Sequence, residues 1–429
     1  EIDLSLPGST GGAIARLVWY QTRLGLSRLR WARRPPESVA ARDRIRIDVS
    51  WSLAAGLSMV DSTRGACFAV RPLLAMPAAD PARIARAFCA AAVAAAGMGR
   101  RRLAGRLRDA AHRAAAGSDD PSAAPYAAFA DVAYLFYLAN DWRGTAAASE
   151  RAASLLPDRK SHTFEGDVIE QHHVWALSIL GELKELRRRV PATIRSAQRI
   201  GNRFVEVSHR TFFSNLHLVA DHPGDALEDL RDALAGWHTA GVGDDVTNPF
   251  FFSLKGRTTA ALYRRDPDGD PSLEDDWRRV RASLLYQIPM IRIETSQFLG
   301  QLAVARAALA RARHDTSASA RHLADARRWI ARSRYGLPAG TDMADLLAAS
   351  TSLVAGELDD ATARFRALVD RLDASGQRTT AAACRRRLAT LVGGTAGDEL
   401  RAAADRYFTE EGVVRPERLT DALLPGWVE

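Results

Sequence analysis

Histidine is the residue type in this chain best suited to bind a metal ion or to exchange a proton near neutral pH. His172 and His173 are adjacent, so on a helix their side chains point about 100° apart and do not readily share one ion. His209 and His217 are separated by two helical turns, which is about 12 Å along the axis, whereas a metal–nitrogen bond is about 2 Å long. These spacings favour histidines that serve the fold, and we therefore predict no metal site.

Paired aspartates could serve an all-helical enzyme similar to the terpene synthases, which use the motif DDxxD. The chain has such pairs at Asp119 and Asp120, Asp244 and Asp245, Asp275 and Asp276, and Asp359 and Asp360. The fifth position of the motif holds no acid in any of them, since the residues there are Ala123, Asn248, Arg279 and Ala363. Helix caps or solvated turns explain the pairs better, although an all-helical enzyme stays open as an alternative.

The motifs of phosphoryl transfer and of nucleophilic hydrolysis are absent from the sequence. Lys255 lies in FFFSLKGR without the upstream glycines of a GxxxxGK[ST] loop, and neither GxSxG nor HExxH occurs. His209 and Arg210, followed by Asn215, are weakly similar to the H-R-D-x-x-x-x-N loop of protein kinases, but Thr211 replaces its aspartate. We therefore predict no catalytic, cofactor-binding or metal-binding residues in this chain.

Aromatic residues gather at residues 250–252 and at Phe212, Phe213 and Trp237. Such a cluster could line a ligand groove. Packing between helices is the commoner use of buried aromatic side chains, so we expect these residues in the core.

The cysteines Cys67, Cys89 and Cys384 form no CxxC pair and lie among apolar or alanine-rich residues. Small buried side chains are the expected interpretation. The scarcity of cysteine fits a reducing compartment, so we expect a cytoplasmic location.

The composition indicates a folded, basic chain. It has 429 residues, of which 47% are hydrophobic, and a net charge of +8. Its basic residues are nearly all arginines that alternate with acids, as at residues 182–189, which indicates solvated helix faces rather than specific nucleic-acid binding. The longest uncharged apolar run, residues 87–99, is about 13 residues long, whereas a membrane span needs about 20. We therefore predict no transmembrane helix.

Residues 46–66 predict a long helix, a break and the start of a second helix. Val49, Leu53 and Val60 share one helical face, and the opposite side is nearly uncharged. We expect this helix to lie buried between neighbours. Asp61 is the expected N-cap of the next helix.

Residues 126–157 form the clearest repeat unit, with one helix, a turn at residues 140–144 and an alanine-rich second helix that ends at Pro157. Turns followed by second helices recur at residues 222–226 and 356–361. The unit resembles a tetratricopeptide (TPR) repeat of about 34 residues. We therefore predict an all-α fold, a TPR-like superhelical solenoid of antiparallel helical hairpins.

The expected organisation has three parts. Residues 1–12 form a connector from an upstream region, residues 13–392 form the TPR-like solenoid, and residues 393–429 form a glycine-rich break with C-terminal capping helices. The chain opens at Glu1 without an initiator methionine, which we interpret as the mark of a fragment.

Two stretches resemble one known family. They are residues 46–75, RIDVSWSLAAGLSMVDSTRGACFAVRPLLA, and residues 404–427, ADRYFTEEGVVRPERLTDALLPGW. Both are similar to segments in the C-terminal region of large bacterial serine/threonine protein kinases, and residues 174–202 and the turn DHPGDAL also fit. In that family a protein-kinase domain is followed by an AAA/STAND-type ATPase and a long TPR-like helical region.

The resemblance implies a regulatory or sensor scaffold for protein–protein interaction in signal transduction. A protein partner or a signalling ligand would bind the concave face, and upstream kinase and ATPase domains would make intramolecular contacts. ATP and Mg²⁺ are implied for those upstream domains, and no cofactor is implied for this segment. The alternatives are a helical-repeat arm of a STAND-type transcription regulator and a stand-alone TPR-like adaptor.

Overall fold

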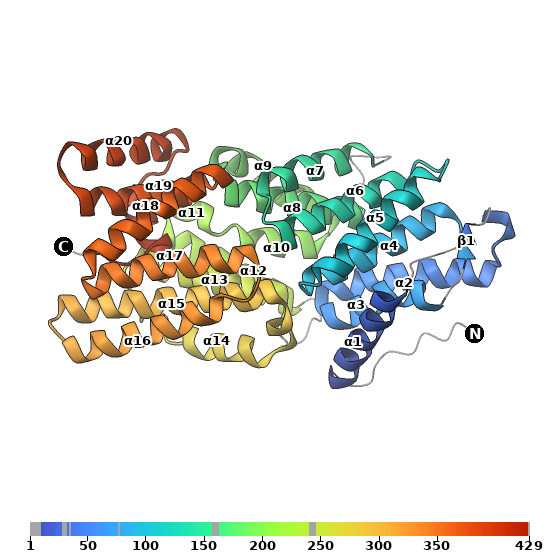
Figure 1. Cartoon of the computed structure of the whole chain (residues 1–429), viewed down its shortest axis with the longest axis horizontal. Helices are drawn as coiled ribbons and strands as arrows, with labels where there is room; N and C mark the ends of the chain where they lie inside the picture. The colour runs from blue at the N-terminus through green and yellow to red at the C-terminus, as the bar shows by residue number, and fades with distance from the viewer. Residues whose placement is uncertain are drawn as a thin grey trace. The chain divides into compact units, whose positions relative to one another are not determined.

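The computed structural model of this chain describes residues 10–27, 32–33, 36–75, 78–156, 163–239 and 246–427. Most of these residues are helical (Figure 1), and the prediction of an all-α fold is confirmed. The strands described there are limited to one parallel pairing of two residues each, β1 (Ala32–Arg33) with β2 (Ala78–Ala79). Within the same ranges, no helix combines the length and the hydropathy needed to cross a bilayer.

The chain divides into two compact units, residues 1–176 and residues 177–429. The boundary falls inside α8 (Phe164–Leu180), where the sequence pattern led us to expect one array over residues 13–392. The sequence pattern did not reveal this boundary, because the hairpin pattern repeats on both sides of it. Such a pattern does not show where the contacts between successive hairpins become sparse. The first helix begins at Thr10, within the expected connector, and residues 1–9 of that connector lie outside the described residues.

Unit 1 is built from consecutive helices that contact their neighbours in the chain. Its elements before α8 are α1 (Thr10–Leu26), η1 (Pro36–Ser38), α2 (Ala41–Val60), α3 (Ser62–Ala75), α4 (Pro81–Gly97), α5 (Arg101–Ala116), α6 (Ala123–Tyr134), the π-helical turn η2 (Leu135–Ala139) and α7 (Trp142–Ser154).

Helix α4 lies at the centre of unit 1, because it contacts α2, α3, α5 and α6. Its start is specified locally: the Asp80 side chain accepts a hydrogen bond from the Arg83 backbone N–H, and Pro81 occupies the first helical position. Ala85 and Ala91 are fully buried. Small side chains of this kind let the neighbouring helices approach α4 closely.

Helix α2 is less buried than the sequence led us to expect. Asp61 does cap the next helix, since its side chain accepts a hydrogen bond from the Arg64 backbone N–H. Ser52 and Gly56 are exposed, however, and Ile45 is 48% exposed. The expectation of a helix buried on both sides is wrong, because the side of Ile47 and Ala54 is buried, whereas Gly56 on the side of Leu53 is exposed.

Unit 2 continues the arrangement after α8. Its elements are α9 (Leu183–Ile200), α10 (Arg203–Phe212), α11 (Asn215–Val219), α12 (Pro223–Thr239), α13 (Asn248–Tyr263), α14 (Leu273–Ala282), η3 (Leu284–Gln287), α15 (Pro289–Ala312), α16 (Thr316–Ser333), α17 (Pro338–Ala355), α18 (Leu358–Ser375), α19 (Arg378–Val392), α20 (Gly394–Glu410) and α21 (Pro416–Leu423).

The later part of unit 2 consists of helical hairpins packed side by side: α15 with α16, α17 with α18, and α19 with α20 (Figure 1). The Leu347 side chain of α17 packs directly on α15 at Gly300, where a Cβ atom would collide with it. Val304, Leu323 and Val354 form part of one buried cluster there. A glycine at this position therefore sets the spacing between two successive hairpins.

The glycine-rich stretch after α19 is a turn within the last hairpin. Gly393 and Gly394 have φ values of 63° and 56°, and α20 begins at once at Gly394. The residues expected to form a capping helix lie within α20. Its side chains at Ala404 and Phe408 are buried, while Arg401 and Glu410 are exposed.

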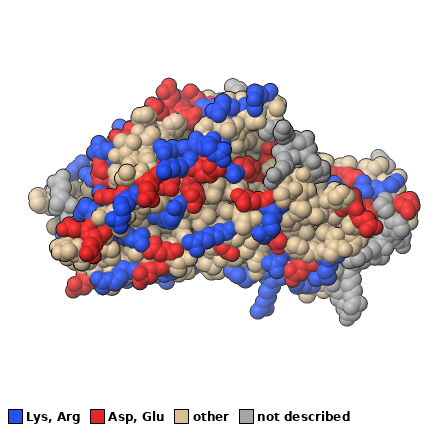
Figure 2. All heavy atoms as spheres, turned by 90° about the horizontal axis from the view of Figure 1, so that it is seen from above, with Lys and Arg blue, Asp and Glu red and all other residues tan. Residues whose placement is uncertain are grey.

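Charged side chains of both signs alternate over the face shown in Figure 2. Glu185 illustrates the pattern, because Arg188 and Arg189 both donate hydrogen bonds to its carboxylate. These bonds stabilise the charged form and lower the pKa of Glu185 to about 2. Much of the arginine content therefore serves ion pairs within the chain.

Replacing Phe365 with alanine should destabilise unit 2 by about 3–5 kcal/mol, because this side chain is fully buried in α18. The matched control is L358A in the same helix, where the side chain is 54% exposed and the expected change is about 0.5 kcal/mol or less. Chemical denaturation monitored by circular dichroism measures both. Equal effects of the two substitutions would contradict the placement of α18.

Candidate protein-interaction site

A segment near the end of the described chain crosses several hairpins of unit 2 instead of joining one. We call residues 413–427, which include α21, the crossing segment. It contacts α13, α15, α17 and α19, which are the first helices of successive hairpins. We call the surface that these four helices present to it the inner face. Leu419 and Leu424 of this segment are buried, with 5% and 1% of their areas exposed.

Asp421 is the charged centre of the contact. Its Oδ2 atom lies 2.7 Å from Nη2 of Arg265, which follows α13, and its Oδ1 atom lies 2.7 Å from Nη2 of Arg387 on α19. Only 3% of the Asp421 side chain is exposed. Burial lowers the pKa of Arg387, and the neighbouring charge of Arg265 acts in the same direction, while Asp421 opposes both. The carboxylate thus keeps two arginines from different hairpins close together.

Side chains of the inner face also bind the main chain of the crossing segment. Gln301 on α15 donates a hydrogen bond from Nε2 to the Leu423 carbonyl at 2.7 Å. Arg387 donates to the Leu424 carbonyl from Nη2 at 2.6 Å and from Nε at 3.1 Å. These two carbonyls belong to the last turn of α21, which has no further helical residues to donate to them.

The end of the crossing segment packs against apolar side chains. Trp427 lies against the buried cluster shared by α15, α16 and α17. Its ring also lies 5.8 Å from the guanidinium carbon of Arg265. Gly426 lies against Leu353 of α17, close enough that an added Cβ would be 3.2 Å from the Leu353 Cδ2 atom.

The chain just before the crossing segment fastens the last hairpin to α9. Glu411 accepts a hydrogen bond from the Lys184 backbone N–H at 2.8 Å, and Arg187 donates to the Glu411 carbonyl at 3.0 Å. The Tyr407 hydroxyl donates to the Gly181 carbonyl at 2.7 Å. The first helix of unit 2, α9, is therefore in direct contact with the end of the last hairpin.

The chemistry of this arrangement is recognition. Two guanidinium groups, one amide and an apolar wall suit a short helix that carries a carboxylate. None of Arg265, Gln301, Arg387 and Asp421 stood out in the sequence motifs. A signal was present in LTDALLP, where an acid stands among leucines whose burial also brings the acid toward the core.

The histidines considered as metal ligands serve the fold of their own units. In unit 1, His172 Nδ1–H donates to the Val168 carbonyl at 2.8 Å, and its Nε2 atom lies 3.3 Å from the Tyr137 hydroxyl. The rings of Phe136 and Trp175 surround it. Desolvation lowers the pKa of His172 to about 4.

In unit 2, His209 is buried and donates from Nδ1 to the Val205 carbonyl at 2.9 Å, while His217 lies 3.8 Å from Asp229. Desolvation lowers the pKa of His209 to about 4. The described residues contain no group of three or more His, Cys, Asp or Glu side chains that could hold a metal ion.

The described aspartate pairs lie at helix starts and turns. Asp120 accepts a hydrogen bond from the Ser122 backbone N–H. Asp276 pairs with Arg257, and Asp360 accepts hydrogen bonds from Ser352 and Arg364. The pair at residues 244–245 lies outside the described residues.

The aromatic cluster is buried between helices of unit 2. Lys255 lies inside it, with its Nζ atom 2.7 Å from Oε1 of Glu294. The same Nζ atom is within 5.1–5.8 Å of four phenylalanine ring centroids, those of Phe212, Phe251, Phe252 and Phe298. The ammonium group of Lys255 thus fills the space between the four rings.

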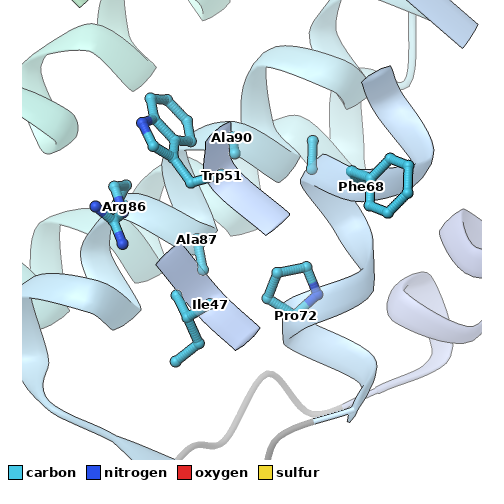
Figure 3. A pocket seen from close by; sticks show the side chains of 8 residues that line it. Ile47, Trp51, Phe68, Pro72, Arg86, Ala87 and Ala90 are labelled. Atoms are coloured by element: carbon cyan, nitrogen blue, oxygen red, sulfur yellow. The ribbon is translucent and has the colours of Figure 1, made fainter. Parts of the chain in front are cut away.

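A hollow in unit 1 is too small for a ligand (Figure 3). It lies beside Trp51, Phe68, Pro72 and Arg86, and its volume of about 10 Å³ suits one water molecule. Arg86 at its edge is already paired with Asp48.

The three cysteines are free and buried. Burial raises the pKa of Cys67 to about 11 and raises the pKa values of Cys89 and Cys384 as well. Thiols in this state are poor nucleophiles.

No family model matches this chain, and no curated protein matches it either.

Acid should destabilise both units between about pH 6.5 and pH 4. The folded chain keeps His172 and His209 neutral down to pH about 4, whereas an unfolded histidine binds a proton near pH 6.5. The unfolded state thus binds more protons in this window, so the free energy of unfolding falls with pH, by up to about 3 kcal/mol for each histidine.

Imidazole NMR signals of the folded chain test this directly. Two histidines should remain neutral at pH 5.5, a pH at which a free imidazole standard in the same sample is largely protonated. Protonation of every histidine in the folded chain at that pH would refute the buried positions of His172 and His209.

Proposed function

We propose that this chain is a regulatory protein-interaction scaffold, built as a TPR-like superhelical solenoid of helical hairpins. The single observation that carries the proposal is the inner face of unit 2, where helices of four hairpins jointly hold the crossing segment. Helical-repeat proteins use such continuous surfaces to bind partners. Enzymatic activity has no comparable support among the described residues, because their buried histidines, acids and cysteines are paired within the fold or kept apart.

The resemblance of residues 46–75 and 404–427 to the C-terminal region of bacterial serine/threonine kinases supplies the biological setting. We place the chain in a cytoplasmic signalling protein whose upstream domains bind ATP with Mg²⁺ and phosphorylate other proteins. Occupancy of the inner face by a partner would shift those domains between inactive and active states, which requires different affinities for the partner in the two states.

A stand-alone adaptor and an arm of a STAND-type transcription regulator use the same kind of surface. They differ from the leading proposal in what the encoded protein carries besides this chain. An assay of the whole gene product therefore separates them.

Phosphoryl transfer to a generic protein substrate is the test of this proposal. The chain alone should show none, whereas the full-length product of its gene should transfer phosphate from ATP. R387Q in the full-length product should change that rate several-fold, because it alters the inner face. The matched control R385Q removes a neighbouring arginine that pairs with Asp373 and should leave the rate unchanged.

Phosphoryl transfer by the chain alone would overturn the scaffold proposal. A full-length product without any ATP-dependent transfer would reject the kinase setting and favour the adaptor or the transcription regulator.

A further inference from the structure

The crossing segment is arranged like a bound peptide rather than like a further repeat. Its helix α21 spans 8 residues, whereas the four helices that the segment contacts, α13, α15, α17 and α19, span 15–24 residues. A repeat helix packs mainly on its hairpin partner and on the next hairpin. The crossing segment instead contacts the first helices of four different hairpins.

The charges of the inner face call for an acidic occupant. Arg265 and Arg387 come from different parts of the chain, and their charges repel each other. Asp421 satisfies both within hydrogen-bond distance, and it is supplied by the crossing segment. Without that carboxylate, Arg387 would be a buried cation without a charged partner, which is strongly unfavourable.

The main-chain contacts point in the same direction. Gln301 and Arg387 bind the carbonyls of Leu423 and Leu424 regardless of the side chains at those positions. The side chains of Leu419, Asp421 and Leu424 are buried, and so are the smaller side chains of Thr420 and Ala422 between them. The two leucines and the aspartate give the pattern Leu-x-Asp-x-x-Leu on a short helix.

We infer that the inner face of unit 2 is a groove for short acidic helical segments of a partner protein with the pattern Leu-x-Asp-x-x-Leu, and that the crossing segment occupies it as an exchangeable internal ligand. This inference rests on the proposed function and names its ligand class. The partner can bind only the molecules whose groove is open. The apparent affinity for the partner is therefore the intrinsic affinity multiplied by the fraction of molecules with an open groove.

The connection to α20 is suited to such an exchange. Gly412 has a φ of 73°, and the next residues, Val413 to Arg415, form a short linker in which Val414 is 57% exposed. One main-chain hydrogen bond, from the Val414 N–H to the Val219 carbonyl, ties this linker to α11. Rotation at the linker moves α21 and the residues after it away without breaking a hairpin.

The experiment uses the full chain and a fluorescent peptide with the sequence of residues 413–427. In the variant D421N, the internal ligand loses its charge while the groove keeps both arginines. This chain should bind the peptide about 30-fold or more tightly than the wild-type chain does, because truncating one partner of a buried charge pair weakens the internal contact by about that factor.

Matched controls distinguish a gain in peptide affinity at the groove from a gain caused by general loosening of the fold. E417Q changes an acid of the same helix whose carboxylate pairs with Arg415, and it should bind the peptide like the wild type. The double variant D421N/R387Q should lose the gain in affinity. A peptide that itself carries D421N should bind the D421N chain at least about tenfold more weakly than the unaltered peptide.

A second measurement uses the wild-type chain, so it does not depend on whether a variant folds. Excess peptide should speed amide hydrogen exchange in residues 413–424 and leave exchange in α18 unchanged. The inference is overturned if a D421N chain with wild-type circular dichroism fails to bind the peptide, or if excess peptide leaves exchange of the wild-type segment unaltered. Such a failure would not affect the phosphoryl-transfer test, so the two proposals fail separately.

Discussion

The carboxylate of Asp421 is the group on which the inner face of unit 2 depends. A buried charge is costly to desolvate and is tolerated where partners surround it. Arg265 and Arg387 provide those partners from opposite ends of the hairpin array, at 2.7 Å each. An ion pair of this kind adds less to stability than to specificity, because only one register of the crossing segment brings the three groups together.

The hairpins set the conditions for this contact. Close approach at Gly300 fixes the spacing of α15 and α17, and the contact of Glu411 with Lys184 and Arg187 joins the last hairpin to α9. A closed arrangement holds the first helices of the hairpins in fixed positions, so that side chains from several of them converge on one short helix. Preorganised groups bind with a smaller loss of conformational freedom.

The sequence was sufficient to predict the helices, but it was not sufficient to predict the long-range contacts between them. The local signal at Asp61 identified a helix start, because capping chemistry acts within one turn, and the structure shows the same chemistry at Asp80 and Pro81. The burial of α2 was overestimated, since periodicity cannot tell which side meets a neighbour. Asp421 and Arg265 are separated by 156 positions, and no local pattern links an acid to an arginine at that distance.

The central claim is that Asp421 and Arg387 act as one unit at the inner face, and a double-mutant cycle on the free energy of unfolding tests it most directly. D421N should destabilise unit 2 by about 3–5 kcal/mol, because it leaves Arg387 without a charged partner, whereas R387Q should cost less, because Asp421 keeps its contact with Arg265. The double variant should cost less than the sum of the two single variants, which is the coupling expected for a directly contacting pair. Additive effects of the two substitutions would contradict the account.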